Sequence, residues 1–131
     1  MYMLDTNICS YIIRKKPENV FNTFKSIPSE NICISIITYA ELYYGVEKTK
    51  SHKINEDVID AFLTMLTIID WDKTAARSYA KIRNELGTKG ELIGNMDLMI
   101  AAHALSLNAT VITNNVSEFK RVKKLKVENW I

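Results

Sequence analysis

Residues 32–46 read ICISIITYAELYYGV, and the hydrophobic pattern changes in the middle of this stretch. Ile32 to Ile37 is rich in β-branched residues and lies between Asn31 and Thr38, which is typical of a short buried strand. From Thr38 onward, apolar residues recur three and four positions apart, which is typical of a helix. The stretch therefore predicts one strand that leads directly into one helix.

The same alternation of short apolar runs and amphipathic stretches continues on both sides. Tyr2 to Leu4 and Thr110 to Thr113 read as strands, and Val127 to Trp130 reads as a last short one. Met96 to Leu107 is an almost wholly apolar helix, and we expect the Gly-rich residues 87–94 to form a surface loop. Strands that alternate with helices predict the α/β class, with a mostly parallel sheet covered by helices on both faces.

Composition limits the class of protein. The chain has 131 residues, 47% hydrophobic and 24% charged, and we expect a single domain over residues 1–131. Its net charge of +2 is too small to indicate a nucleic-acid partner by itself. Cys9 and Cys33 have no partners at metal-ligand spacing, so we expect both in the core as free thiols. Without a signal peptide or membrane span in the sequence, we expect a soluble, cytoplasmic protein.

Four acidic residues stand out because we expect all of them at or just after the carboxyl ends of strands: Asp5, Glu41, Asp97 and Glu118. In parallel α/β folds, that edge is where the loops open toward a ligand crevice. Each acid also has an ordinary interpretation, as a helix-dipole partner for the two aspartates and as a solvated surface residue for the two glutamates. The four acids therefore indicate a site only because they occur together.

Carboxylates that share a pocket repel one another, and their pKa values rise unless a cation neutralises them. Oxygen ligands without Cys or His select Mg²⁺ or Mn²⁺, commonly through one or two direct carboxylates and several waters. The predicted chemistry is metal-assisted hydrolysis of a phosphodiester. The sequence offers no Ser/His/Asp set, and His103 lies six residues past Asp97, on a different side of the helix.

Four segments hold the acids in a characteristic order. They read LDTN from Leu4, AELYYG from Ala40, IGNMDLMIAAHA from Ile93 and TNNVSEF from Thr113, and VENW from Val127 closes the chain. Together they resemble the PIN-domain ribonucleases over the full length, most closely the VapC toxins of bacterial type II toxin–antitoxin pairs. The resemblance implies a three-layer α/β/α fold with a mostly parallel central sheet. It also implies a homodimeric, Mg²⁺- or Mn²⁺-dependent endoribonuclease that acts on cellular RNA, often tRNA, and is inhibited by a cognate VapB-type antitoxin.

The resemblance further implies roles for individual residues. The catalytic residues are the four acids already named, of which Asp5 and Asp97 correspond to the principal metal ligands. Thr6 and Thr113 correspond to hydroxyl residues that flank the site in supporting roles. Asn115 stands where some PIN nucleases have an acid, so the resemblance does not extend to a fully formed second metal site.

Five cations in seven residues follow Glu118: Lys120, Arg121, Lys123, Lys124 and Lys126. A solvated charge run near a chain end is the ordinary interpretation. An acidic metal pocket, however, needs a nearby group that attracts a polyanion, and we expect this run to leave the same sheet edge as the acids. The basic triplet Arg14, Lys15 and Lys16 is expected to extend this RNA-binding track.

Two alternatives to a nuclease remain open from the sequence. A phosphoacceptor receiver domain is also a small α/β protein, but it needs a second acid beside Asp5, where this chain has Thr6 and Asn7. The other alternative is a PIN-like module that binds RNA or a partner without cutting.

An antitoxin that blocks such a site would need two kinds of contact. We expect a basic side chain over the acids and an apolar segment near Tyr39, Tyr43 and Tyr44 or the helical residues 54–66. Ordinary core packing is the competing interpretation for those aromatic residues.

Overall fold

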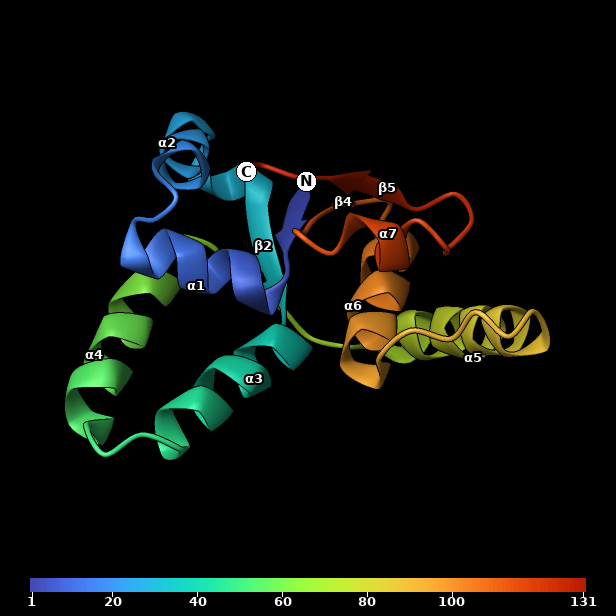
Figure 1. Cartoon of the computed structure of the whole chain (residues 1–131), viewed down its shortest axis with the longest axis horizontal. Helices are drawn as coiled ribbons and strands as arrows, with labels where there is room; N and C mark the ends of the chain where they lie inside the picture. Colours follow the sequence, from blue (N-terminus) through green and yellow to red (C-terminus); the bar gives the residue numbers. More distant parts are fainter.

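The central element is a sheet of five parallel strands in the order β3-β2-β1-β4-β5, seen in a computed structural model that describes all 131 residues (Figure 1). The strands are β1 (Tyr2–Leu4), β2 (Ile32–Ser35), β3 (Thr67–Ile69), β4 (Thr110–Ile112) and β5 (Lys126–Glu128). β1 pairs with β2 and β4, so that Met3 lies beside Cys33 on one side and Val111 on the other. Because every pair is parallel, the carboxyl ends of all the strands meet at one edge.

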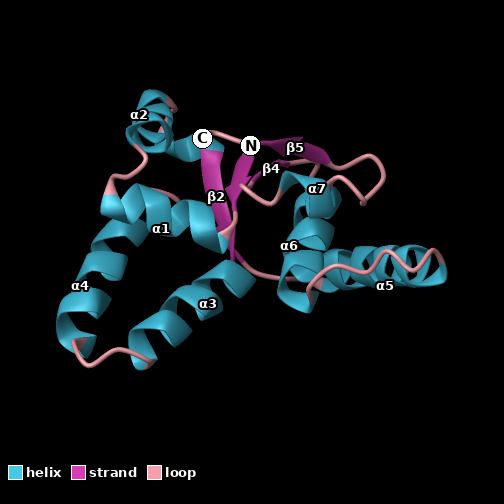
Figure 2. Cartoon of the chain, in the orientation of Figure 1, coloured by secondary structure: helices cyan, strands magenta, loops and turns pink.

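Helices cover both faces of this sheet (Figure 2), which confirms the expected three layers. One layer contains α1 (Thr6–Arg14), α2 (Glu18–Ser26), α3 (Ile36–Glu47) and α4 (His52–Leu63). The other contains α5 (Lys73–Thr88), α6 (Asn95–Ser106) and the short α7 (Val116–Phe119). None of the helices is both long and apolar enough to cross a membrane.

Alternating side chains along the strands create two separate cores. Met3 and Val111 point toward α5 and α6, whereas their neighbours Leu4 and Ile112 point toward α1 to α4. All four side chains are fully buried, which explains why the strands read as continuous apolar runs. The two cysteines are both free and buried, as expected.

The boundary between β2 and α3 lies earlier than the sequence pattern indicates. The strand ends at Ser35 and not at Ile37, because the Ser35 hydroxyl accepts a hydrogen bond from the backbone N–H of Ile37 at 3.1 Å. This side-chain contact makes Ser35 the N-cap of α3, and the helix begins one residue later. The β-branched residues at positions 36 and 37 thus belong to a helix.

The last strand is also displaced from its expected range of 127–130. Pairing with β4 restricts β5 to Lys126–Glu128. Trp130 lies beyond the strand and packs edge-on against Tyr2, with 5.7 Å between the ring centroids. Its apolar character therefore reflects burial against β1 and not strand pairing.

Candidate active site

Asp5 lies at the carboxyl end of β1 and fixes the start of α1. One carboxylate oxygen accepts a hydrogen bond from the backbone N–H of Ile8 at 2.9 Å, and the other accepts one from the Thr113 hydroxyl at 2.5 Å. Thr113 directly follows β4, the neighbour of β1, so parallel pairing brings the two residues together. Burial raises the pKa of Asp5, the two hydrogen bonds oppose this rise, and the charge of Glu41 adds to it.

Glu41 approaches the same edge from the second turn of α3. One of its carboxylate oxygens accepts a hydrogen bond from the Thr6 hydroxyl at 2.6 Å. Thr6 is the first residue of α1, so the contact links the starts of two helices that follow adjacent strands. Thr6 and Thr113 thus each donate a hydrogen bond to one acid, and their supporting roles in a reaction stay a prediction.

Asp97 reaches the site by a different route from the one expected. It does not follow a strand, since α6 comes after α5 and the connecting residues 89–94, and Asp97 lies in the first turn of this buried helix. The amide of Asn115 lies 3.5 Å from an Asp97 carboxylate oxygen, and its backbone N–H donates to Thr113 at 2.9 Å. Asn115 therefore bridges the two aspartates through Thr113.

The four acids form one electrostatic group, here called the acidic cluster (Asp5, Glu41, Asp97 and Glu118). Burial raises the pKa of Asp97 to about 6, and the negative charges of the other three acids contribute to the rise. Glu118 lies in α7 and not in an open loop. The single ion pair of the protein joins Lys53 to Asp57, so no cation of the chain neutralises the acidic cluster.

The acidic cluster fits a hard divalent cation, because the ligand atoms that it offers are carboxylate oxygens. No three His, Cys, Asp or Glu side chains lie close enough to enclose a metal ion. An ion bound here would therefore take one or two direct carboxylates and complete its shell with water, as Mg²⁺ commonly does. A closed cage of the kind that holds structural zinc is excluded.

A hollow of about 510 Å³ opens beside Thr6 and Glu41, between α1, α3 and α4. Its lining combines Arg14 with apolar side chains that include Val46 and Val58. Glu41 is the one member of the acidic cluster that lines the hollow, so a chain bound there would contact this acid and an apolar wall together.

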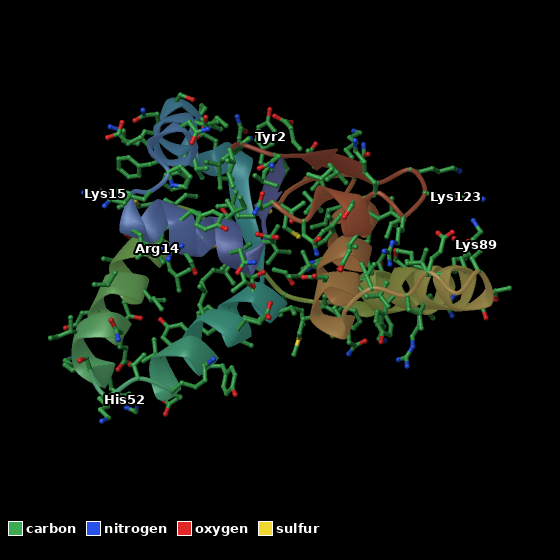
Figure 3. All side chains as sticks on the ribbon, in the orientation of Figure 1. Tyr2, Arg14, Lys15, His52, Lys89 and Lys123 are labelled. Carbon is green, nitrogen blue, oxygen red and sulfur yellow. The ribbon has the colours of Figure 1, made fainter.

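The basic residues do not form the single track that the sequence suggests. The run starts after α7, near the acids, but Lys126 begins β5 and so lies at the opposite edge of the sheet. Arg121 donates to the backbone carbonyls of Glu91 and Leu92 at 3.4 and 3.2 Å. Figure 3 shows Arg14 and Lys123 on opposite sides of the molecule, so the two basic groups are separate.

His103 is buried away from the acidic cluster, as its position in α6 predicts. Its Nδ1 lies 2.8 Å from the Ser35 hydroxyl, the N-cap of α3. Burial lowers its pKa, so the ring is neutral at pH 7. The pair connects α6, which carries Asp97, to α3, which carries Glu41. The sequence offered no signal for this link because the two residues are 68 positions apart.

Known proteins share this arrangement over nearly the whole chain. A family model described as the PIN domain matches residues 2–125. Ribonuclease VapC2 of Rickettsia felis is 48% identical over 131 residues, which cover 99% of this chain and 98% of that protein. The tRNA(fMet)-specific endonuclease VapC of Salmonella typhimurium is 41% identical over 129 residues, 98% of this chain and 97% of that protein.

A solved structure extends the similarity to three dimensions. The crystal structure of VapBC2 from Rickettsia felis bound to a DNA fragment from their promoter matches with a TM-score of 0.93 and 46% identity. The match covers 99% of this chain and 98% of that one.

The raised pKa of Asp97 predicts how stability depends on pH. The unfolded state loses the Asp97 proton near pH 4 and the folded state near pH 6, so this residue destabilises the fold increasingly as the pH rises through that interval. Asp97→Asn should therefore raise the thermal midpoint in chelator at pH 7, and the gain should shrink toward pH 4. Thermal unfolding followed by circular dichroism measures both values.

The matched control is Glu85→Gln, which changes an exposed acid on α5 that forms no ion pair. The thermal midpoint of this variant should equal that of the wild type both at pH 7 and near pH 4. A variant Asp97→Asn that is less stable than the wild type at pH 7 would contradict the electrostatic account.

Proposed function

Because the chain belongs to the PIN-domain family, and within it to the VapC ribonucleases, we propose that the acidic cluster is the site of RNA hydrolysis. The observation that supports this assignment is the convergence of Asp5, Glu41 and Asp97 at one edge of the sheet, where Thr6, Thr113 and Asn115 donate hydrogen bonds to them. Burial and the neighbouring carboxylates raise the pKa of Asp97 to about 6, which agrees with this arrangement. Carboxylates that share a partly buried site favour a divalent cation, because the cation would reduce their repulsion. We further propose that the whole of residues 1–131 works as one domain and that the cation is Mg²⁺, with Mn²⁺ able to replace it.

In the proposed mechanism, Asp5 and Asp97 hold the ion, which when bound activates water and offsets negative charge on the phosphate. Asp5 keeps a fixed orientation because Ile8 and Thr113 already occupy one lone pair on each of its oxygens. Asn115 holds the Asp97 carboxylate from the side. Glu41, held by Thr6, and Glu118, on α7, are positioned to accept protons or to orient water around the phosphate.

The substrate proposed for this site is cellular RNA in the cytoplasm, with tRNA as the first class to test. The support is the name of the Salmonella typhimurium relative, an endonuclease specific for tRNA(fMet) that is 41% identical to this chain. The site is open to solvent on the Asp97 side, where α6 begins with exposed residues, and a folded RNA can approach it there.

A VapB-type antitoxin is the proposed protein partner, supported by the VapBC complex that matches this chain with a TM-score of 0.93. Two neighbouring apolar surfaces suit it: the hollow beside Glu41 and a second hollow of about 230 Å³ between α1, α2 and α4. Val58 lines both and is 44% exposed. We propose that an apolar segment of the antitoxin covers Val58 while a basic side chain reaches the acids. The homodimer implied by the family resemblance stays a prediction.

The tyrosines expected at this surface divide into two groups. Tyr39 and Tyr43 stack with 4.6 Å between ring centroids, and the Tyr43 hydroxyl bonds to Asp60, so they join α3 to α4. Tyr44 is 64% exposed and lies under the Lys48 ammonium. Tyr44 is therefore the most exposed of the three tyrosines, whereas Tyr39 and Tyr43 are partly buried.

Removal of either principal acid tests the catalytic assignment. Asp5→Asn and Asp97→Asn should each reduce cleavage of a total tRNA pool by at least about 100-fold while the circular dichroism spectrum stays unchanged. Excess chelator should abolish wild-type cleavage, and added Mg²⁺ should restore it. Full activity of Asp97→Asn, or cleavage that persists in chelator, would contradict the proposal and favour a module that binds without using these acids.

A charge placed in the apolar surface tests the antitoxin site. Val58→Asp should weaken binding of the cognate antitoxin about tenfold or more, because an unpaired carboxylate would be buried in the complex. Ile54→Asp is the matched control, since Ile54 lies one turn earlier on α4, is 68% exposed and lines neither hollow. Fluorescence anisotropy with labelled antitoxin measures both, and equal effects of the two substitutions would argue against this surface.

The basic run after α7 is proposed to contact RNA phosphates. Lys123→Ala together with Lys124→Ala should weaken RNA binding and reduce the salt slope of log K by up to about 1.4, at roughly 0.7 per phosphate contact with a single strand. Lys15→Ala with Lys16→Ala removes the same charge from the other side of the molecule and should change the slope less. Filter binding over a salt series measures the slope for both double variants. An unchanged slope in the variant with Lys123→Ala and Lys124→Ala would indicate that the basic run is only a solvated surface.

A further inference from the structure

The basic residues at the end of α1 have no role in the sites described so far, although they adjoin the two apolar hollows near Glu41. These hollows share the lining residues Ile13 and Val58, so they form one continuous depression, here called the α1 groove. Arg14 lines the larger hollow and Lys15 lines the smaller one. Figure 3 shows both side chains at the end of α1 that lies away from the sheet.

An acid marks the other end of the α1 groove. Glu41 lines the larger hollow, and one of its oxygens accepts a hydrogen bond from Thr6, the first residue of α1. Its second oxygen has no hydrogen-bond partner, and no cation of the chain pairs with it. Arg14 is the last residue of the same helix. At a rise of about 1.5 Å per residue, the α1 groove therefore has a negative and a positive end roughly 12 Å apart.

The cations at the positive end are held by aromatic rings and not by carboxylates. The guanidinium carbon of Arg14 lies 5.3 Å from the centroid of the Tyr11 ring. The ammonium groups of Lys15 and Lys25 lie 5.5 and 4.9 Å from the centroid of the Phe21 ring. Phe21 itself lines the smaller hollow, and none of the three cations forms an ion pair. A carboxylate that reaches this end would thus meet three unpaired cations.

The wall between the two ends is apolar, which favours a polypeptide over RNA. Apart from Lys15, every residue that lines the smaller hollow is apolar, and Phe24 and Phe62 pack together there with 5.9 Å between their ring centroids. A nucleic-acid backbone carries a phosphate at every nucleotide, so it would leave this wall uncovered and would be repelled at the Glu41 end. An amphipathic peptide segment buries such a wall and can carry a different charge at each end.

We propose that the antitoxin segment in the α1 groove carries opposite charges at its two ends. Its basic side chain meets Glu41, its apolar residues cover the wall, and its acidic side chains meet Arg14, Lys15 and Lys25. The proposal rests on the antitoxin surface proposed above, and it adds the acidic end and therefore the direction in which the segment lies. The basic and the first acidic residue should be about eight positions apart in a helical segment, or about four in an extended one.

The test measures the affinity of the labelled cognate antitoxin for charge-reversed variants by fluorescence anisotropy. At low salt, Lys15→Glu and Lys25→Glu should each weaken binding about fivefold or more, because the new carboxylate would repel the acids of the segment. At about 1 M salt the difference from the wild type should fall below about twofold, because these charges are then screened. Acidic residues of the antitoxin segment are also replaced by lysine one at a time. One of these antitoxin variants should bind Lys15→Glu to within about twofold of the wild-type pair.

Lys89→Glu is the matched control, because Lys89 is likewise an exposed, unpaired lysine at the C-cap of a helix, in this case α5. Figure 3 shows it on the opposite side of the molecule from Lys15. Lys89→Glu should change the antitoxin affinity less than about twofold. Binding of a fluorescent RNA in chelator, measured with the same variants, should differ between Lys15→Glu and Lys89→Glu by less than about twofold.

Three results would overturn this proposal alone. An equal effect of Lys15→Glu and Lys89→Glu on antitoxin affinity would indicate that only the net charge matters. Unchanged antitoxin affinity in Lys15→Glu and Lys25→Glu, while Val58→Asp still weakens binding, would keep the antitoxin site and reject its acidic end. Weaker RNA binding of Lys15→Glu with unchanged antitoxin affinity would assign these cations to RNA. If Val58→Asp left the antitoxin affinity unchanged as well, both proposals would fail, so the two failures can be told apart.

Discussion

Carboxylates that are held at one edge of the sheet without a cation are the constraint on which the candidate site depends. Asp5 is buried, Asp97 is half-buried, and no lysine or arginine of the chain pairs with either. Such an arrangement costs stability in the absence of a cation, so the surrounding fold must hold it together. The parallel sheet holds Asp5 in place through hydrogen bonds from the start of α1 and from Thr113. The buried helix α6 brings Asp97 to the same edge of the sheet. If the acidic cluster is the active site, as proposed, stability and activity are opposed there.

The hydrogen bonds around the acids show how the fold holds this charge. Threonine hydroxyls and an amide supply donors to three of the four acids, and none of these donors carries a charge. Neutral donors orient a carboxylate without neutralising it, whereas a lysine or arginine partner would compete with a divalent ion. The cations of residues 120–126 form no ion pair with the acids.

Much of the fold and of the acid set could be predicted from the sequence, because both follow from local patterns. The strand-to-helix change in residues 32–46 predicts a βα unit, and Asp5 precedes two good helix caps. Asp97 follows a loop and not a strand, so that part of the prediction was wrong, but the almost wholly apolar sequence of α6 indicates a buried helix whose N-terminal end brings Asp97 to the site. The contact between Ser35 and His103 could not be predicted, since it depends on how α3 and α6 pack and not on any local pattern.

The pKa of the Asp97 carboxyl, followed by carbon-detected NMR in chelator and again in about 10 mM Mg²⁺, tests the central claim most directly. The account predicts a pKa of about 6 in chelator, because burial and three neighbouring charges disfavour ionisation. It predicts a fall to below about 5 when Mg²⁺ is added, because a bound cation favours the ionised form. A pKa near the ordinary value of 3.8 in chelator, or one that Mg²⁺ does not change, would contradict a self-repelling cluster that binds a divalent ion.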